Sequence, residues 1–208
     1  MGLIFKNNIS PFTIIGIWEV DETPENFFSD ELNSVKSESR KKEIVATKFL
    51  LSELCCINAT IGHTENGKPY LKNSRQNISI SHSYKYVALI LEKRYETGID
   101  IQKITAKITR IKEKFMSNEE LKSLTGGESP IEKLHVYWGA KECVFKSYVK
   151  GNLIFSENIF IEPFNYQNTG EIFAHLKLPD EKKTFTLHYE KRDAYMLVYI
   201  TDLINIVK

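Results

Sequence analysis

The chain has 208 residues, of which 42% are hydrophobic and 26% are charged. This length and composition are typical of a globular protein with one large domain or two small ones, and they exclude a disordered chain. The formal net charge of +1 gives no broad basic field, so we expect no nucleic acid and no membrane as partner, and any anion site must be local.

The first half of the chain opens with one predicted strand and two predicted helices. Residues 12–20 alternate and are rich in Ile, which is typical of a strand. Thr23 as N-cap and Pro24 at the first helical position predict a short helix over residues 24–32. Apolar residues at helical spacing predict a longer helix over residues 40–56, with its two adjacent cysteines as small core residues.

Three strand-like segments follow, at residues 78–81, 86–91 and 97–102. The polar residues Ser81, His82 and Ser83 lie after the first of them and predict a tight turn. Strands joined by so short a connection pair antiparallel.

Two short elements begin the second half. Residues 104–115 are expected to be helical. Ser117 and Glu120 have the spacing of a capping box, which predicts the start of another short helix. Residues 125–129 are expected to form a turn.

A strong start signal for a long helix comes next. Ser129 is a suitable N-cap, Pro130 fits the first helical position, and Glu132 fits the third. The helix is expected to continue through residue 150, where Gly151 is well placed to end it.

The remainder of the chain is rich in β-forming residues. Residues 153–200 are interpreted as strands separated by turns, including an edge hairpin that closes near Arg192 and Asp193. Each half of the chain therefore mixes helices with antiparallel strands. The pattern predicts an α+β fold repeated twice, with a tight boundary within residues 92–103.

The sequence carries no predicted address outside the cytoplasm. Its N-terminal residues lack the apolar run of a signal peptide, and no segment is long enough to span a bilayer. The three cysteines lack the spacing of a zinc site or a CxxC motif. We therefore expect a cytoplasmic protein.

One charge is out of place on the long predicted helix. The apolar stripe of this helix consists of Ile131, Leu134, Trp138, Phe145 and Val149. Helical spacing places Glu142 within the stripe, where a carboxylate costs on the order of several kcal/mol unless a positive charge meets it. Two interpretations stay open: a buried functional carboxylate, or an ordinary surface pair with Lys146 one turn further on.

A second carboxylate lies in the strand predicted at residues 97–102. Alternation sends the two isoleucines of this strand to one face, and Gly98, Asp100 and Gln102 to the other. If the isoleucines are core, Asp100 and Glu142 supply oxygen ligands from separate elements, as a magnesium site with water and phosphate ligands requires. The alternative is that Asp100 caps a turn or faces water.

Candidate anion-binding residues are scattered through the first half. Lys68 is presented by a Gly-Lys-Pro turn, and Ser81 and His82 lie on the predicted tight connection. Arg40 and Lys48 contribute to a basic helix face. Each has a plain structural alternative, since such lysines are usually solvated and His82 could be a hydrogen-bonded structural residue. The phosphate-binding patterns GxxxxGK[ST] and GxGxxG do not occur.

Five segments occur in the order of a known family. They are GKPY at 67–70, ISISHS at 78–83, GIDIQ at 98–102, FMSNEE at 115–120 and WGAKECVFK at 138–146. Together they resemble the 4'-phosphopantetheinyl transferases of the larger, surfactin-type class, whose usual pattern is GKP, then ISHS, GIDIE, FSxxE and a WxxKExxxK helix. GIDI alone would be weak, whereas all of these motifs in order are highly specific.

The resemblance implies a fold and a catalytic set. The fold is α+β with two pseudo-symmetric halves, residues 1–98 and 99–208, and coenzyme A in the cleft between them. In the family, the aspartate of GID and the glutamate of KE hold Mg²⁺ on the pyrophosphate, and these positions are Asp100 and Glu142. The same glutamate is proposed to take the serine proton, and Lys146 matches a lysine that contacts the phosphates.

The resemblance also implies a set of contacts to coenzyme A. They are Lys48, Lys68, Ser81, His82 and, as a looser match, Arg40. One position departs from the pattern, because the family often has a glutamate as third metal ligand where this chain has Gln102. A neutral amide oxygen can still ligate the metal or hold a water, so we expect activity to survive with weaker metal affinity.

The implied enzyme transfers 4'-phosphopantetheine from coenzyme A to a serine of an acyl or peptidyl carrier protein and releases 3',5'-adenosine bisphosphate. Magnesium and a lysine would stabilise the charge that develops on the pyrophosphate. A chain that builds its own cleft is expected to be a monomer. The alternative is a degenerate relative that binds coenzyme A without transfer, with Gln102 as the first lost ligand. An unrelated magnesium phosphoesterase or a structural protein fits the residues less well.

Overall fold

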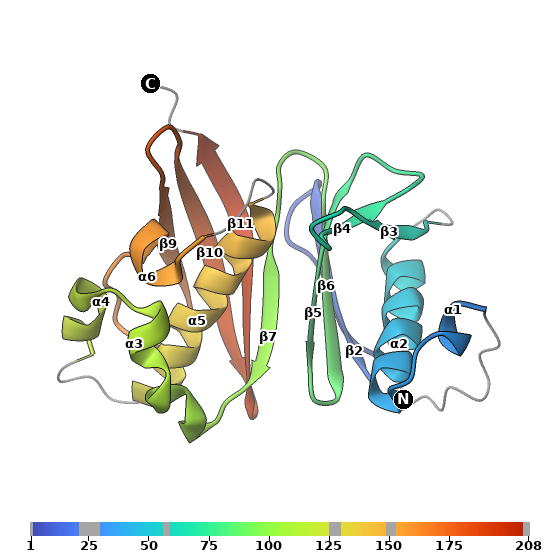
Figure 1. Ribbon diagram of the computed structural model, residues 1–208, viewed down its shortest axis with the longest axis horizontal. Helices are drawn as coiled ribbons and strands as arrows, with labels where there is room; N and C mark the ends of the chain where they lie inside the picture. The colour runs from blue at the N-terminus through green and yellow to red at the C-terminus, as the bar shows by residue number, and fades with distance from the viewer. Residues whose placement is uncertain (1, 21–29, 56–58, 125–129, 149–152, 206–208) are drawn as a thin grey trace. The chain divides into compact units, whose positions relative to one another are not determined.

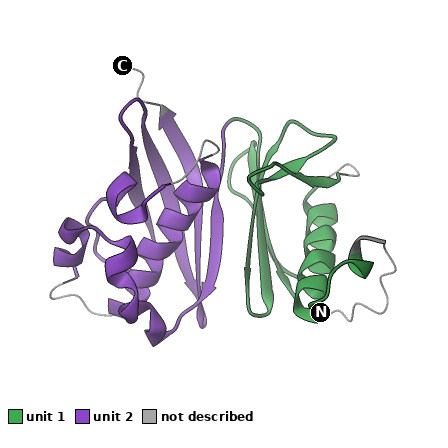
Figure 2. Ribbon diagram, in the orientation of Figure 1, with its two compact units in different colours: residues 1–94 green, residues 95–208 purple. Residues whose placement is uncertain are grey.

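The computed structural model describes residues 2–20, 30–55, 59–124, 130–148 and 153–205. The chain divides into two compact units, Met1–Arg94 and Tyr95–Lys208, called unit 1 and unit 2 below (Figure 2). Their boundary falls within residues 92–103 and ahead of the division at residues 98/99 that the resemblance implies. Both units mix helices with antiparallel strands, so the chain has the expected α+β character (Figure 1).

Unit 1 packs one long helix against a sheet. Its elements are β1 (Leu3–Asn8), β2 (Thr13–Glu19), α1 (Asp30–Asn33), α2 (Glu38–Leu54), β3 (Ile61–His63), β4 (Pro69–Leu71), β5 (Asn77–Ser83) and β6 (Tyr86–Glu92). Four strands form an antiparallel sheet in the order β1-β2-β6-β5, and β3 pairs with β4 separately. Leucines of α2 pack with Val87, Leu89 and Leu91 of β6 to form the core.

The ends of α2 follow from local chemistry. The Ser37 side chain accepts a hydrogen bond from the Arg40 backbone N–H at 3.3 Å, so the helix begins two residues before the predicted start. It ends at Leu54, and Cys55 is the partly exposed C-cap, packed against the core of unit 1. Cys56 and most of the helix predicted at residues 24–32 lie outside the described residues.

The turn predicted at Ser81, His82 and Ser83 is wrong. These residues belong to β5, which continues until Ser83 pairs with Tyr86. The hairpin closes through Tyr84 and Lys85 instead, and Tyr84 takes the positive φ of 55° that a two-residue connection needs. Because the strand continues, successive side chains in this segment alternate between opposite faces of the sheet.

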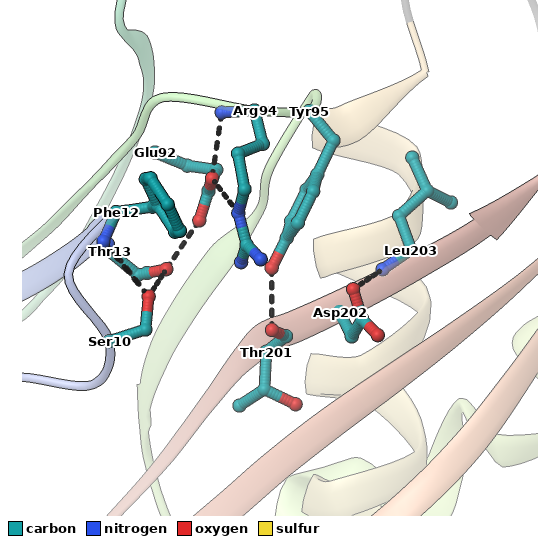
Figure 3. A network of polar contacts seen from close by, with 9 residues as sticks. All are labelled: Ser10, Phe12, Thr13, Glu92, Arg94, Tyr95, Thr201, Asp202 and Leu203. Atoms are coloured by element: carbon teal, nitrogen blue, oxygen red, sulfur yellow. Dashed lines mark hydrogen bonds and ion pairs between the residues drawn. The ribbon is translucent and has the colours of Figure 1, made fainter.

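A buried carboxylate ends β6. The Glu92 side chain is fully buried and accepts hydrogen bonds from the Thr13 hydroxyl and from Arg94, through its backbone N–H at 2.8 Å and its Nε at 3.1 Å (Figure 3). The Arg94 guanidinium also lies 4.7 Å from the centre of the Phe12 ring. A carboxylate is tolerated in a core only with such partners, so this network fixes the last residues of unit 1 against β2.

Unit 2 is built on a larger sheet. Its elements are β7 (Ile99–Lys103), the 3₁₀ helix η2 (Ala106–Arg110), α3 (Lys112–Phe115), α4 (Asn118–Lys122), α5 (Pro130–Ser147), α6 (Phe155–Asn158), β8 (Ile159–Ile161), β9 (Thr169–Lys177), β10 (Lys182–Arg192) and β11 (Tyr195–Asn205). The sheet is antiparallel in the order β7-β11-β10-β9-β8, and α5 lies across one face of it (Figure 1). The hairpin predicted near Arg192 and Asp193 therefore lies inside the sheet rather than at its edge.

Two predicted helix starts of unit 2, those of α4 and α5, are confirmed. Ser117 and Glu120 form both hydrogen bonds of a capping box at the start of α4. The long helix begins at Pro130 and ends at Ser147, three residues short of the prediction. Residues 104–115 form η2 and α3 instead of one helix. The predicted turn at residues 125–129 and Gly151 lie outside the described residues.

The buried face of α5 differs from the predicted apolar stripe. The core positions of this helix include Leu134, Tyr137, Ala140 and Val144. Phe145 is 40% exposed, and Trp138 is only partly buried. Both rings lie less than 6 Å from the Phe155 ring of α6, at 5.6 and 5.7 Å between centroids. The sheet therefore covers one face of α5, and these two aromatic rings pack against α6 at the side of that face.

Across the described ranges, no helix is both long and apolar enough to cross a membrane.

An ion pair locks α5 in unit 2. The Lys141 side chain is fully buried and donates to Glu120 Oε2 at 2.8 Å and to the carbonyls of Phe155 at 3.0 Å and Ile159 at 2.5 Å. Glu120 also accepts from two backbone N–H groups, those of Ser117 at 2.7 Å and Ile161 at 2.8 Å. All three donors of the ammonium group are thus used. The pair ties α5 to α4, α6 and β8.

Candidate active site

The strand β7 presents its polar residues to α5. Asp100 lies directly opposite Val198 of β11, and Gln102 lies opposite Met196; both β11 residues belong to the core under α5. Asp100 is only 6% exposed. A Cβ atom at Gly98 would lie 2.0 Å from the carbonyl oxygen of Cys143. The glycine therefore lets the backbone of α5 rest on the chain just before Asp100.

Asp100 is held by a lysine from the last turn of α5. Lys146 Nζ donates to Asp100 Oδ1 at 2.8 Å and to the Ile99 carbonyl at 2.9 Å. Burial is the largest influence and acts to lower the pKa of Lys146, but the charge of Asp100, its hydrogen bond to Lys146 and the neighbouring Cys143 and Glu142 together raise the pKa above its ordinary value. The Lys146 ion pair in the structure is with Asp100, rather than with Glu142 as in the surface-pair interpretation.

Glu142 lies one turn before Lys146, at the edge of the buried face. Burial raises the pKa of its carboxyl to about 7; the charge of Asp100 adds to this rise and the charge of Lys146 opposes it. The charge of Asp100 acts on Glu142 as a neighbouring negative charge, and a cation between the two carboxylates would be favoured. Within the described residues, no three His, Cys, Asp or Glu side chains are grouped as a metal site. Two carboxylates completed by water and phosphate oxygens suit magnesium, which rarely takes an all-protein cage.

Gln102 lies beside Asp100, but its amide oxygen is turned away. Gln102 Nε2 donates to Asp100 Oδ2 at 3.0 Å, while Oε1 lies 2.7 Å from Nδ1 of His135. An amide nitrogen that carries two hydrogens is a donor and no metal ligand. Of the three side chains predicted as ligands, Asp100 and Glu142 carry carboxylate oxygens in this site, whereas Gln102 presents its amide nitrogen to Asp100.

His135 is a neighbour that sequence reasoning missed. It is buried on α5, two helical turns before Glu142, and burial lowers the pKa of its imidazole. Spacing of seven residues on one helix was the available signal, because it places both side chains on the same face. The sequence alone gives no reason to connect an isolated histidine in an apolar stretch with Glu142 through this spacing.

The basic residues of unit 1 surround a cavity of about 690 Å³. Arg40 and Lys48 reach it from α2, and His82 reaches it from β5. Gly67 and Pro69, on either side of Lys68, are part of its wall, while the Lys68 side chain is not. The structure therefore brings three of the predicted coenzyme A contacts to one cavity and places the fourth in the adjoining turn.

Ser81 is placed differently. Ile80 and His82 line the cavity, so alternation along β5 sends Ser81 to the opposite face of the sheet. The prediction that Ser81 stands beside His82 rested on the turn that the structure replaces by a strand. Two cavity residues were not predicted as contacts: His63, and Thr47, whose Oγ1 lies 3.4 Å from His82 Nε2.

Comparison with known protein families gives a match to unit 2. The sequence pattern of the 4'-phosphopantetheinyl transferase superfamily matches residues 96–199, half of the chain. The match includes Asp100, Glu142 and Lys146. The chain therefore belongs to the 4'-phosphopantetheinyl transferase superfamily, and it is a transferase of phosphopantetheine.

A relative extends the similarity beyond unit 2. The chain is 27% identical over 210 residues to a protein of Haemophilus influenzae (strain ATCC 51907 / DSM 11121 / KW20 / Rd) that bears the name "Putative 4'-phosphopantetheinyl transferase". The alignment covers 91% of this chain and 87% of that protein. Most of unit 1 therefore shares in the similarity.

Proposed function

We propose that the protein transfers the 4'-phosphopantetheine arm of coenzyme A to a serine of an acyl or peptidyl carrier protein, with Mg²⁺, and releases 3',5'-adenosine bisphosphate. The single observation that carries the proposal is the cluster of Asp100, Glu142 and Lys146. The three side chains come from two elements and meet on the covered face of β7. Two carboxylates and one ammonium group gathered in this way suit the binding of a pyrophosphate with its metal ion.

Each residue of the cluster has a separate part in the proposed reaction. Asp100 and Glu142 would hold Mg²⁺, which when bound neutralises negative charge on the pyrophosphate. Glu142 would accept the proton of the attacking serine hydroxyl, directly or through a water. Lys146, already oriented by Asp100 and the Ile99 carbonyl, would donate to a phosphate oxygen as the bond to the leaving group breaks. The protein supplies position and charge and needs no covalent intermediate.

The cavity of unit 1 is the proposed site for the nucleotide end of coenzyme A. Arg40, Lys48 and His82 line it, and each can donate to a phosphate oxygen. The apolar wall, which includes Ile44, Leu51 and Ile61, suits a flat base. Lys68 in the adjoining turn would be a further phosphate contact. Ser81 stays a proposed contact only if it acts from the other face of β5.

The proposal extends to the class of transferase. Unit 1 places α2 against a sheet of four strands, and unit 2 places α5 against a sheet of five. One long helix against one antiparallel sheet in each unit supports a fold of two pseudo-symmetric halves, with residues 1–98 carrying coenzyme A contacts and residues 99–208 carrying the metal ligands. Such a chain would be of the surfactin-type class and would act as a monomer.

Intact mass of a purified apo carrier protein tests the reaction directly. Incubation with this protein, coenzyme A and Mg²⁺ should add the mass of one phosphopantetheine, and the gain should be lost with EDTA or with Glu142→Ala. Acyl and peptidyl carriers are tested side by side. No gain on either carrier, with coenzyme A still bound in calorimetry, would replace the proposal by the degenerate binding relative.

A further inference from the structure

Three hydrogen bonds in series connect the backbone at Thr105 to the Asp100 carboxylate. The Thr105 backbone N–H lies 3.0 Å from His135 Nε2, His135 Nδ1 lies 2.7 Å from Gln102 Oε1, and Gln102 Nε2 lies 3.0 Å from Asp100 Oδ2. His135 is 3% exposed. We call this series the Thr105–Asp100 relay.

The first link fixes the proton on His135. A backbone N–H can only donate, so Nε2 must accept from Thr105 and carries no hydrogen. The Thr105 carbonyl lies 3.2 Å from the same nitrogen, but a hydrogen placed there would point into the closer N–H group. The imidazole is therefore neutral with its proton on Nδ1, and Nδ1 donates to Gln102.

The last links fix the amide of Gln102 independently. Its Nε2 lies 3.1 Å from the carbonyl oxygen of His135 as well as 3.0 Å from Asp100 Oδ2. A backbone carbonyl can only accept, so the NH₂ group must face it, and Oε1 must face the imidazole. The reversed amide would place its oxygen against two acceptors. Both ends of the relay thus require the same direction of donation.

The packing of α5 leaves Gln102 little freedom. A Cβ atom at Gly139 would lie 3.0 Å from Gln102 Nε2 and 2.7 Å from a methyl carbon of Val198. The helix backbone therefore approaches the amide as closely as a glycine allows. Confined in this way, the amide keeps its NH₂ group directed at Asp100.

We propose that His135 and Gln102 are positioning residues for Asp100, and that Gln102 acts as a hydrogen-bond donor to this carboxylate and not as a third metal ligand. The inference rests on the proposed function for the role of Asp100. Lys146 holds one oxygen of the carboxylate and Gln102 holds the other, so its plane is set before any metal binds. Outer partners of this kind orient the ligands of many metal sites.

The relay predicts an NMR signature that needs neither metal nor activity. In the ¹⁵N-labelled full chain, long-range ¹H–¹⁵N correlations should show His135 as the neutral tautomer with its proton on Nδ1 at pH 7. The Gln102→Met variant should shift the Nδ1 resonance, because it removes the acceptor. A proton on Nε2, or an imidazolium ion at this pH, would overturn the relay.

Metal binding then tests its consequence. Mn²⁺ binding in the presence of coenzyme A, without carrier protein, is followed by electron paramagnetic resonance. His135→Leu should weaken Mn²⁺ affinity roughly tenfold or more, as loss of an outer partner commonly does. His135→Asn is the matched control, since it also loses the Thr105 contact but keeps an N–H near the position of Nδ1. Equal affinities of the two variants would overturn the positioning role.

A substitution at Gln102 separates positioning from ligation. Gln102→Glu cannot donate to Asp100 and adds a repelling charge, so the relay predicts weaker Mn²⁺ affinity than in the parent protein. A ligand role predicts tighter affinity, because a carboxylate replaces an amide. If the parent protein with coenzyme A bound no Mn²⁺, the proposed function would fall, and the His135 tautomer would still decide the relay.

Discussion

The cations that line the cavity of unit 1 and the lysines of α5 in unit 2 are held in opposite ways. In unit 1, Arg40 and Lys48 line an open cavity, and the Arg40 side chain is 51% exposed. In unit 2, Lys141 is fully buried, and Lys146 is fixed to Asp100 at 2.8 Å. Exposed cations can adjust to a ligand when it arrives, whereas buried charges must be arranged before it does. Under the proposed function, unit 1 therefore serves binding and unit 2 supplies charge in fixed positions.

Glu142→Gln should have the largest effect on catalysis. It keeps the shape of the side chain but removes the charge and the proton acceptor, so we expect the transfer rate to fall by roughly 10³-fold or more. The initial rate of mass gain on a carrier protein measures this. Glu119→Gln on the exposed side of α4 is the control and should transfer at the parent rate. Near-parent transfer by Glu142→Gln would remove this residue from the mechanism.

Lys141→Met should have the largest effect on stability. It leaves the buried Glu120 carboxylate without its cation, and breaking a buried pair in this way costs about 3–5 kcal/mol. Urea unfolding followed by circular dichroism measures the change. Lys107→Met, at an exposed position of η2, should change the free energy of unfolding by less than about 0.5 kcal/mol. Equal stability of the two variants would show that the buried pair does not hold α5.

Lys48→Met tests the binding role of unit 1. Loss of one charge-assisted contact to a phosphate is worth about 1.5–3 kcal/mol, so the Kd for coenzyme A should rise at least tenfold. The limiting rate at saturating coenzyme A should change little, because the proposal assigns Lys48 to binding and assigns the chemical step to residues of unit 2. Calorimetry gives the Kd, with Lys36→Met outside the cavity as control. A lower limiting rate with unchanged Kd would contradict the division of roles.

The smallest effect is expected at Ser81. Its side chain lies on the face of β5 away from the cavity, so Ser81→Ala should leave coenzyme A affinity within about twofold, or less than about 0.5 kcal/mol. His82→Ala, one residue further along and in the cavity wall, should weaken it clearly. Similar losses from both variants in the same calorimetric titration would return Ser81 to the binding site.

Strand periodicity predicted the environment of Asp100 well. Two isoleucines alternating with polar residues gave the face of β7, and Ile99 and Ile101 are buried. Periodicity failed at Ser81, because a polar segment resembles a turn unless one knows that β5 continues to Ser83. The actual turn includes Tyr84, a bulky residue with positive φ, which no turn preference would select.

The sequence predicted that the Glu142 carboxylate is partly buried, but the apolar stripe used for this prediction is not the buried face of α5. The apolar stripe around Glu142 contained Trp138 and Phe145, which are not fully buried and whose rings pack beside Phe155 of α6. Helical spacing states which residues share a face, but only the tertiary partners decide which face is core. His135 could not be predicted for the same reason, since its role depends on the distance between α5 and Gln102.

The contact at Gly98 sets a limit on how far unit 2 can tolerate change. Side chains that meet across a core can be exchanged for others and repacked, but the space above Gly98 is filled by the Cys143 carbonyl. A contact between two backbones cannot be relieved by a change of side-chain rotamer. The distance between β7, which contains Asp100, and α5, which contains Glu142, is therefore set by this contact between two backbones. Drift in the surrounding core can alter the stability of this unit without altering the spacing of its two acids.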